Sequence, residues 1–133
     1  MTAVVDAAAV VAALVDVGAE GRWAESMLDA GPLAAPHLMP VEAANILRRA
    51  ARRARSPRIP QPWPMDLLQL RIELFAYAPV AQRAWELRGA ITAYDAWYVA
   101  LAEFLDAPLV TLDQRLARAP GPRCAFSIPP PPP

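Results

Sequence analysis

The chain has 133 residues, which is enough for one domain with its own hydrophobic core and too few for two domains of ordinary size. Its 13 basic residues, all arginine, balance 13 acidic residues, which argues against a protein that coats nucleic acid through overall positive charge. The single cysteine, Cys124, excludes an internal disulfide and a cysteine-rich zinc site, and it fits a reducing cytoplasm.

In the first half of the chain, short apolar strands alternate with helices. We predict a strand at residues 3–5 that stops at Asp6, followed by an alanine-rich helix to about residue 14. The apolar run 7–15 is much shorter than the roughly 20 residues that cross a bilayer, so we expect no membrane span. Further elements are expected at 22–29 (helix), 33–35 (weak strand) and 41 to about 55 (amphipathic helix).

The second half begins with a loop, because residues 56–64 contain four prolines. A helix is expected to begin near Met65, and residues 66–77 and 79–88 are predicted as two helical stretches, with an extended piece at 73–78 as the alternative. A helix at 92–104, a strand at 109–112, a short helix at 114–119 and a strand at 124–126 follow. We expect one domain over residues 1–128 and a disordered polyproline tail at 129–133.

This alternation predicts an α/β fold with a short parallel sheet of four or five strands, covered by helices on both faces. Ligands of such sheets bind beyond the carboxyl ends of the strands. Asp6 and Asp113 each follow a predicted strand, so both are expected at that edge.

Four carboxylates stand at the ends of predicted elements: Asp6, Glu42, Asp95 and Asp113. Each has a structural explanation when taken singly. Thr92-x-x-Asp95 matches a capping box, and the helix dipole favours a first-turn acid such as Glu42 by roughly 0.3 to 1 kcal/mol. The other two could cap the helices that follow them.

The four acids also occur in a characteristic order and spacing, within Asp6-Ala7-Ala8, Pro40–Asn45, Tyr94-Asp95-Ala96 and Leu109–Asp113. In this pattern the chain resembles the PIN-domain ribonucleases, and among them the VapC-type toxins of bacterial toxin–antitoxin pairs, from residue 4 to about residue 126. The resemblance implies a three-layer α/β/α domain that hydrolyses RNA and leaves a 5′-phosphate. Ala8 departs from the pattern, because similar proteins often carry a hydroxyl residue there.

The same resemblance implies roles for the site residues. Asp6, Asp95 and Asp113 would be ligands of Mg²⁺ or Mn²⁺, and Glu42 a further ligand or the residue that positions the attacking water. Thr111 and Asn45 are secondary candidates. Four carboxylates in one pocket repel one another, so they take up protons or bind a hard divalent cation, which agrees with these roles. A VapB-like antitoxin and a homodimer are the implied partners.

Other chemistries are excluded by missing residue types. His37 is the only histidine, so a two-histidine ribonuclease is impossible, and no nucleophile-elbow sequence accompanies it. The chain has no lysine, which excludes a P-loop and the lysine-dependent phosphate-accepting receiver and haloacid-dehalogenase types. The alternative that stays open is a catalytically silent PIN-fold module that binds RNA or a protein.

The strongest local charge feature is a run of arginines in and after the helix that carries Glu42. It is either a solvated helix face or an edge that holds RNA phosphates. Among the aromatic residues, we expect Trp85 and Trp97 in the core and Trp63 in the loop. The arginines of the run are Arg48, Arg49, Arg52, Arg53, Arg55 and Arg58.

Overall fold

The computed structural model describes residues 1–54 and 71–132. Several predictions fall outside these residues: the loop at 56–64 with Trp63, the helix start near Met65, and the positions of Arg55 and Arg58.

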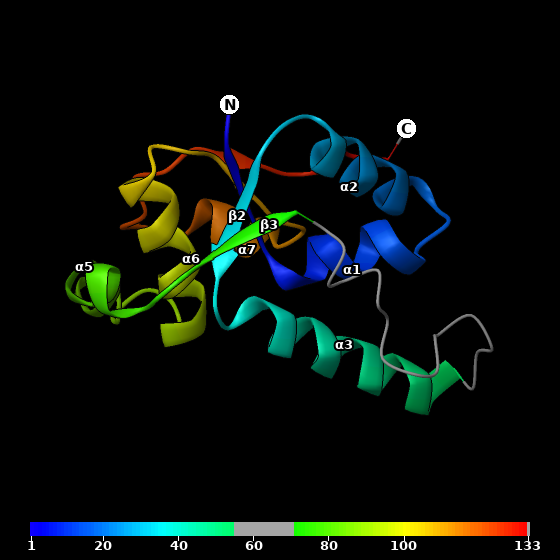
Figure 1. The fold of residues 1–133 in the computed structure, drawn as a ribbon, viewed down its shortest axis with the longest axis horizontal. Coiled ribbons are helices and arrows are strands. Elements are labelled where there is room, and N and C mark those ends of the chain that lie inside the picture. The colour runs from blue at the N-terminus through cyan, green and yellow to red at the C-terminus, as the bar shows by residue number, and fades with distance from the viewer. Residues whose placement is uncertain (55–70, 133) are drawn as a thin grey trace.

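A parallel sheet forms the centre of the molecule (Figure 1). Val4 in the central strand pairs with Ala34 on one side and with Leu109 on the other, and every neighbouring pair runs parallel. The strand order is β3-β2-β1-β4-β5, so the residues after β1 and β4 emerge next to each other at the carboxyl edge. The described strands are β1 (Ala3–Val5), β2 (Leu33–Pro36), β3 (Ile72–Phe75), β4 (Leu109–Val110) and β5 (Phe126–Ser127).

Helices cover both faces of the sheet, which confirms the predicted three-layer α/β/α fold. In Figure 1, α1 (Ala7–Val15), α2 (Ala19–Asp29) and α3 (Met39–Ala54) lie on one side. The 3₁₀ turn η1 (Ala78–Val80), α5 (Ala81–Glu86) and α6 (Ala93–Phe104) lie on the other, and α7 (Gln114–Arg118) follows β4. No helix in the described part of the chain has the length and apolar character to span a membrane.

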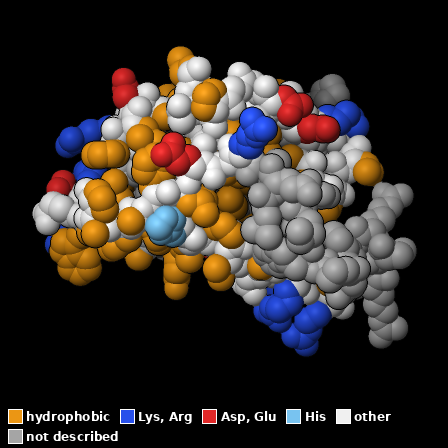
Figure 2. Space-filling view, in the orientation of Figure 1, with side chains coloured by type: hydrophobic (Ala, Val, Ile, Leu, Met, Phe, Trp, Pro, Cys, Tyr) orange, Lys and Arg blue, Asp and Glu red, His pale blue; other side chains and the backbone are white. Residues whose placement is uncertain are grey.

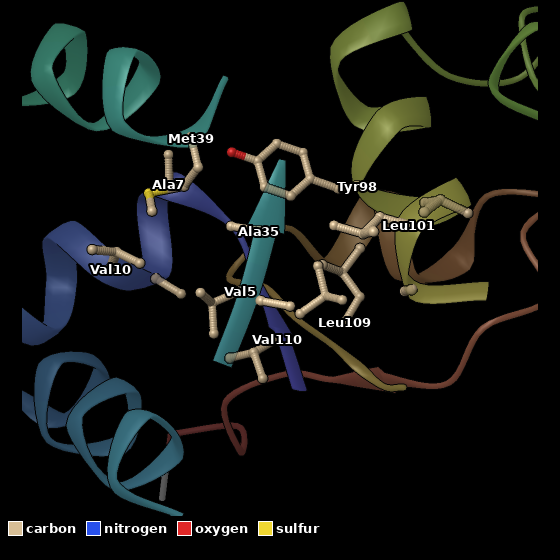
Figure 3. Close-up of a cluster of buried hydrophobic side chains, with 14 of the residues drawn as sticks. Val5, Ala7, Val10, Ala35, Met39, Tyr98, Leu101, Leu109 and Val110 are labelled. Carbon is tan, nitrogen blue, oxygen red and sulfur yellow. The ribbon is translucent and has the colours of Figure 1, made fainter. Parts of the chain in front are cut away.

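Small and β-branched side chains fill the space between the sheet and the helices (Figure 3). Val5, Val10 and Leu109 are completely buried, and the alanines of α1 and α6 let these helices approach the sheet closely. Tyr98 of α6 is an exception in size and polarity, because its ring is buried while its hydroxyl points toward the start of α3 (Figure 3). At the carboxyl edge of the sheet, the core therefore ends in a polar side chain.

Segment 72–77 differs from the predicted helix. Residues 72–75 form β3, an edge strand that pairs with β2 from Leu33↔Ile72 to Pro36↔Phe75. The helical prediction for this part of 66–77 is therefore wrong, and the extended alternative at 73–78 is correct for residues 73–75, since η1 begins at Ala78. The physical reason is a tertiary contact. β2 presents a free edge, and pairing with it satisfies the backbone hydrogen-bonding groups of residues 72–75, whose helical pattern is weak.

Other predicted elements are confirmed with shifted ends. The second helix begins at Ala19 and the third at Met39, and the stretch 79–88 divides into η1 and α5. The last strand lies at 126–127 rather than 124–126. At the end of the chain Pro129 is buried, whereas residues 130–132 are exposed.

The expected core position of Trp85 is wrong, because 62% of its surface is exposed. The guanidinium of Arg88 lies over its ring, 4.6 Å from the centroid, so the tryptophan stacks with a cation and stays outside the core. Trp97 is partly buried against the core and meets the ring of Tyr77 edge-on at 5.1 Å.

Candidate active site

The four predicted carboxylates line one pocket of about 310 Å³ at the carboxyl edge of the sheet. Asp6 follows β1, and Asp113 stands three residues beyond the end of β4. Glu42 lies in the first turn of α3 and Asp95 in the first turn of α6. Their neighbours in the wall are Ala7, Ala8, Ile46, Tyr98 and Leu112.

Asp6 is the most strongly perturbed of these acids. Burial raises its pKa to about 6, although hydrogen bonds from Thr111 and Ala9 act in the opposite direction. The negative charges of Asp95 and Glu42 raise it further. One oxygen of Asp6, Oδ1, accepts the backbone N–H of Ala9 at 2.8 Å, which caps α1 as expected.

Thr111 connects the two acids that follow strands. Its side chain is completely buried, and its hydroxyl donates a hydrogen bond to Oδ2 of Asp6. The hydroxyl oxygen of Thr111 in turn accepts the backbone N–H of Asp113 at 3.0 Å. Because one hydroxyl uses both its donor and its acceptor capacity, it sets the position of Asp6 relative to Asp113.

Sequence reasoning missed a specific role for Tyr98. Its hydroxyl donates a hydrogen bond of 2.7 Å to Oε1 of Glu42, so a residue of α6 holds a carboxylate of α3. Burial raises the pKa of Glu42, while this hydrogen bond lowers it and the charge of Asp95 raises it. The signal in the sequence was the spacing Asp95-x-x-Tyr98, which puts both side chains on one helix face.

The other two acids combine a capping position with a place in the pocket. The hydroxyl of Thr92 accepts the backbone N–H of Asp95 at 3.1 Å, and Oδ1 of Asp113 accepts those of Arg115 and Leu116 at 2.9 and 3.1 Å. Burial raises the pKa of Asp95, and the charge of Asp113 adds to this rise. Capping therefore does not compete with a role in the pocket.

The spacing of the acids is wider than that of a closed metal site. Within residues 1–54 and 71–132, no three His, Cys, Asp or Glu side chains are grouped so that they could hold a metal ion as they stand. The charges of these acids nevertheless affect one another's pKa values, so they share one electrostatic environment.

Asn45 lies apart from this pocket. It is exposed, and its Oδ1 accepts a hydrogen bond of 3.1 Å from Nε of Arg48. The structure therefore pairs this secondary candidate with the arginine run. His37 is exposed as well, directly after β2.

The arginines of α3 are exposed and line a separate hollow of about 430 Å³. Figure 2 shows a group of basic side chains (blue) at the lower edge, where α3 lies. At 100° per residue, Arg49 and Arg53 lie within about 20° of the direction of Glu42, whereas Arg48 and Arg52 point well to one side. The four arginines of this hollow are Arg48, Arg49, Arg52 and Arg53.

Comparisons with known proteins identify the family. Residues 3–122 match the model of the PIN domain. Ribonuclease VapC1 of Mycobacterium tuberculosis is 40% identical over 127 residues, which cover 94% of this chain and 96% of that protein. The crystal structure of PAE2754 from Pyrobaculum aerophilum has a TM-score of 0.67 at 26% identity, over 95% of this chain and 83% of that chain.

A more distant solved structure has the same fold. VapBC2 from Rickettsia felis, bound to a DNA fragment from their promoter, has a TM-score of 0.65 at 16% identity, over 96% of this chain and 98% of that chain. The family match covers most of the chain and includes the segments that carry all four acids. The chain therefore belongs to the PIN-domain family, among the VapC ribonucleases.

Proposed function

We propose that the chain is the toxin of a toxin–antitoxin pair, an endoribonuclease that hydrolyses RNA at the four-carboxylate pocket with the help of Mg²⁺ or Mn²⁺. The observation that carries this proposal is the gathering of Asp6, Glu42, Asp95 and Asp113 around one pocket. The identity of 40% to Ribonuclease VapC1 supports the same activity. The substrate would be cellular RNA, so we expect the enzyme to act in the cytoplasm.

The donor set fits a hard divalent cation. All four candidate ligands are carboxylates, the oxygen donors that Mg²⁺ and Mn²⁺ prefer. Carboxylates repel one another, and a divalent cation held by Asp6, Asp95 and Asp113 would offset this repulsion. When bound, such an ion would lower the pKa of a water molecule and would neutralise charge that develops on the phosphate.

The residues of the chain then have distinct tasks. Thr111 holds Asp6, and through the backbone of Asp113 it fixes the distance between two ligands. The hydroxyl of Tyr98 donates a hydrogen bond to Oε1 of Glu42, so Oε2 is the oxygen that this contact leaves available. We therefore assign to Oε2 of Glu42 the task of accepting the proton of the attacking water, and to its hydrogen bond with Tyr98 the task of keeping that oxygen directed into the pocket.

The partners follow from the proposed role. A toxin needs an antitoxin, and one of the solved structures with this fold is VapBC2 bound to promoter DNA. We propose a VapB-like antitoxin whose peptide covers the carboxylate pocket, and a homodimer of the toxin chain.

The proposal is tested by incubating the purified chain with cellular RNA and mapping the new 5′ ends. We expect cleavage with Mn²⁺ or Mg²⁺, none with EDTA, and none for Asp95→Asn combined with Asp113→Asn. Asparagine caps helices as well as aspartate does, so Asp113→Asn keeps the cap of α7, and the cap of α6 is Thr92, which the variant leaves unchanged. Asp29→Asn, at the exposed end of α2, is the matched control and stays active. Intact RNA with a folded wild-type chain would support the silent binding module instead.

Replacing Tyr98 with phenylalanine is expected to lower kcat by about tenfold, because Glu42 loses the contact that orients it. Since that hydrogen bond lowers the pKa of Glu42, its loss should also move the acidic limb of the pH–rate profile to higher pH. Tyr94→Phe, on an exposed ring of the same helix, is the control. An unchanged rate and profile in Tyr98→Phe would remove Tyr98 from the machinery.

A further inference from the structure

A second hollow adjoins the carboxylate pocket. It has a volume of about 540 Å³ and is lined by the segment after α5, the first turn of α6 and the start of α7. Asp95 and Asp113 line both spaces, so the two hollows meet at these carboxylates. We call the second hollow the side trough and define it by Arg88, Thr92, Asp95, Asp113 and Arg115.

Two arginines make the side trough different from the carboxylate pocket. Arg88 and Arg115 are both exposed. Arg88 is held in place by its stacking on Trp85, at 4.6 Å, and by a hydrogen bond of 3.0 Å from Nη1 to the carbonyl of Trp85. The ion pairs found among residues 1–54 and 71–132 involve Arg83 and neither of these two arginines.

The carboxylate pocket carries negative charges, and the side trough beside it carries two positive charges that can attract a polyanion. A nucleic acid strand that approaches four carboxylates is repelled, unless cations beside them attract its neighbouring phosphates. Guanidinium groups bind phosphate oxygens through two parallel hydrogen bonds. The hydroxyl of Thr92 is engaged with Asp95, because it accepts the backbone N–H of that residue and lowers the pKa of its carboxyl through a side-chain hydrogen bond, so the two arginines are the groups of the trough that suit a phosphate.

The rest of the lining carries no group that reads bases, since Gly89, Ala90, Ile91, Leu116 and Ala119 are small or apolar. Contacts to phosphate and sugar position a strand, whereas base contacts specify its sequence. The composition of the trough therefore favours the sugar–phosphate backbone as its ligand.

We propose that the side trough binds the phosphate next to the scissile bond of the RNA strand, through Arg88 and Arg115, and so positions the bond at the carboxylates. This inference rests on the proposed ribonuclease function. Arg88 and Arg115 are positioning residues for that reaction, because they hold the strand and leave the bond that breaks to the carboxylates. The arginines of α3 line a hollow of their own, so the side trough is a separate contact with the strand.

The test compares Arg88→Gln combined with Arg115→Gln against a charge-matched control, Arg22→Gln combined with Arg123→Gln. Neither control residue lines the trough or the carboxylate pocket, and both are exposed. Binding is measured by fluorescence anisotropy on labelled single-stranded RNA of mixed sequence, over a series of salt concentrations. Asp6→Asn is present in both variants and in the reference, so that the RNA stays intact during the measurement.

We expect the trough variant to bind RNA at least about tenfold more weakly, and its plot of log Kd against log salt to be shallower by about 0.7, which corresponds to the loss of one phosphate contact on a single strand. With Asp6 restored, KM rises while kcat at saturating RNA stays near the wild-type value. Arg88→Lys with Arg115→Lys keeps the charges but loses the paired hydrogen bonds, so its affinity for RNA should lie between that of the trough variant and that of the reference.

Unchanged affinity and salt slope in the trough variant would overturn the inference, and so would an equal loss in the control. These results leave the proposed function intact, because the wild-type chain still cleaves RNA. The proposed function fails separately if the wild-type chain cleaves no RNA with either metal. The placement of the trough beside a scissile bond then falls with it.

Discussion

Replacing Asp6 with asparagine is expected to make the protein more stable in the absence of divalent cations and, at the same time, inactive. Burial raises the pKa of this carboxyl from 3.8 to about 6, so its charged form is unfavourable in the folded state. Asparagine removes the charge. Its single side-chain oxygen can still accept the N–H of Ala9 and cap α1, whereas the hydrogen bond from the Thr111 hydroxyl to the second oxygen of Asp6 is lost, which offsets part of the gain.

The direction of the pH dependence follows from proton binding. Between pH 3.8 and about 6, Asp6 holds a proton in the folded state that it has released in the unfolded state, so the contribution of this carboxyl to stability is greatest below pH 4 and falls as pH rises to about 6. The difference between the two pKa values corresponds to a loss of about 3 kcal/mol at neutral pH. For a domain of this size, this gain, less the lost hydrogen bond from Thr111, raises the Tm of the variant by roughly 5 to 10 °C.

Thermal melts from pH 4 to pH 8 in EDTA measure this effect. Wild type should lose stability over that window relative to Asp6→Asn, and the two proteins should converge near pH 4. Asp29→Asn should follow the wild-type curve throughout, because Asp29 lies at the exposed end of α2. A variant that melts below wild type at every pH would mean that the carboxylate stabilises the fold, contrary to the burial cost.

The same substitution is expected to lower RNA cleavage by at least about a hundredfold, since a neutral amide is a poor ligand for a hard cation and a direct ligand matters more than its outer partners. Substitution of an active-site residue often stabilises a protein, because active sites retain local strain or charge repulsion that the chemistry requires. Wild-type cleavage activity in Asp6→Asn would contradict its role as a ligand.

Much of the pocket could be predicted, because the residues that build it follow recognisable element ends. Asp6 and Asp113 come after short apolar runs, and parallel strands release such residues at one edge. Helix-start signals placed Glu42 and Asp95 in first turns. Local patterns do not say which side-chain atoms meet, so the contact between Tyr98 and Glu42, separated by 56 positions, was not foreseen.

One error comes from a contact between distant segments and the other from a local contact at the surface. Residues 72–75 form a strand because β2 offers an edge, which a local pattern does not contain. Trp85 has a helical spacing that suits a core residue, yet α5 is short. The ring of Trp85 lies at the surface under the guanidinium of Arg88. Arg88 of this stacked pair lines the side trough, which meets the carboxylate pocket at Asp95 and Asp113.

Adding Mn²⁺ or Mg²⁺ is expected to stabilise the wild-type chain strongly, because a ligand that binds only the folded state shifts the unfolding equilibrium by mass action. At a concentration of about 100 times Kd the gain is about 2.7 kcal/mol. This is close to the cost of the buried Asp6 charge, which a bound cation would offset. We therefore expect Tm to rise by about 10 °C in wild type and in Asp29→Asn.

The two stability effects test each other, because Asp6→Asn starts from a higher Tm without metal and should gain little from it. Melts of both proteins in EDTA, in Mn²⁺ and in NaCl of equal ionic strength separate specific binding from screening. The wild-type and variant curves should approach each other in Mn²⁺ and stay apart in NaCl. An equal rise in both proteins would place the cation elsewhere and would remove Asp6 from the set of ligands, even if burial of its carboxyl accounts for the melts in EDTA.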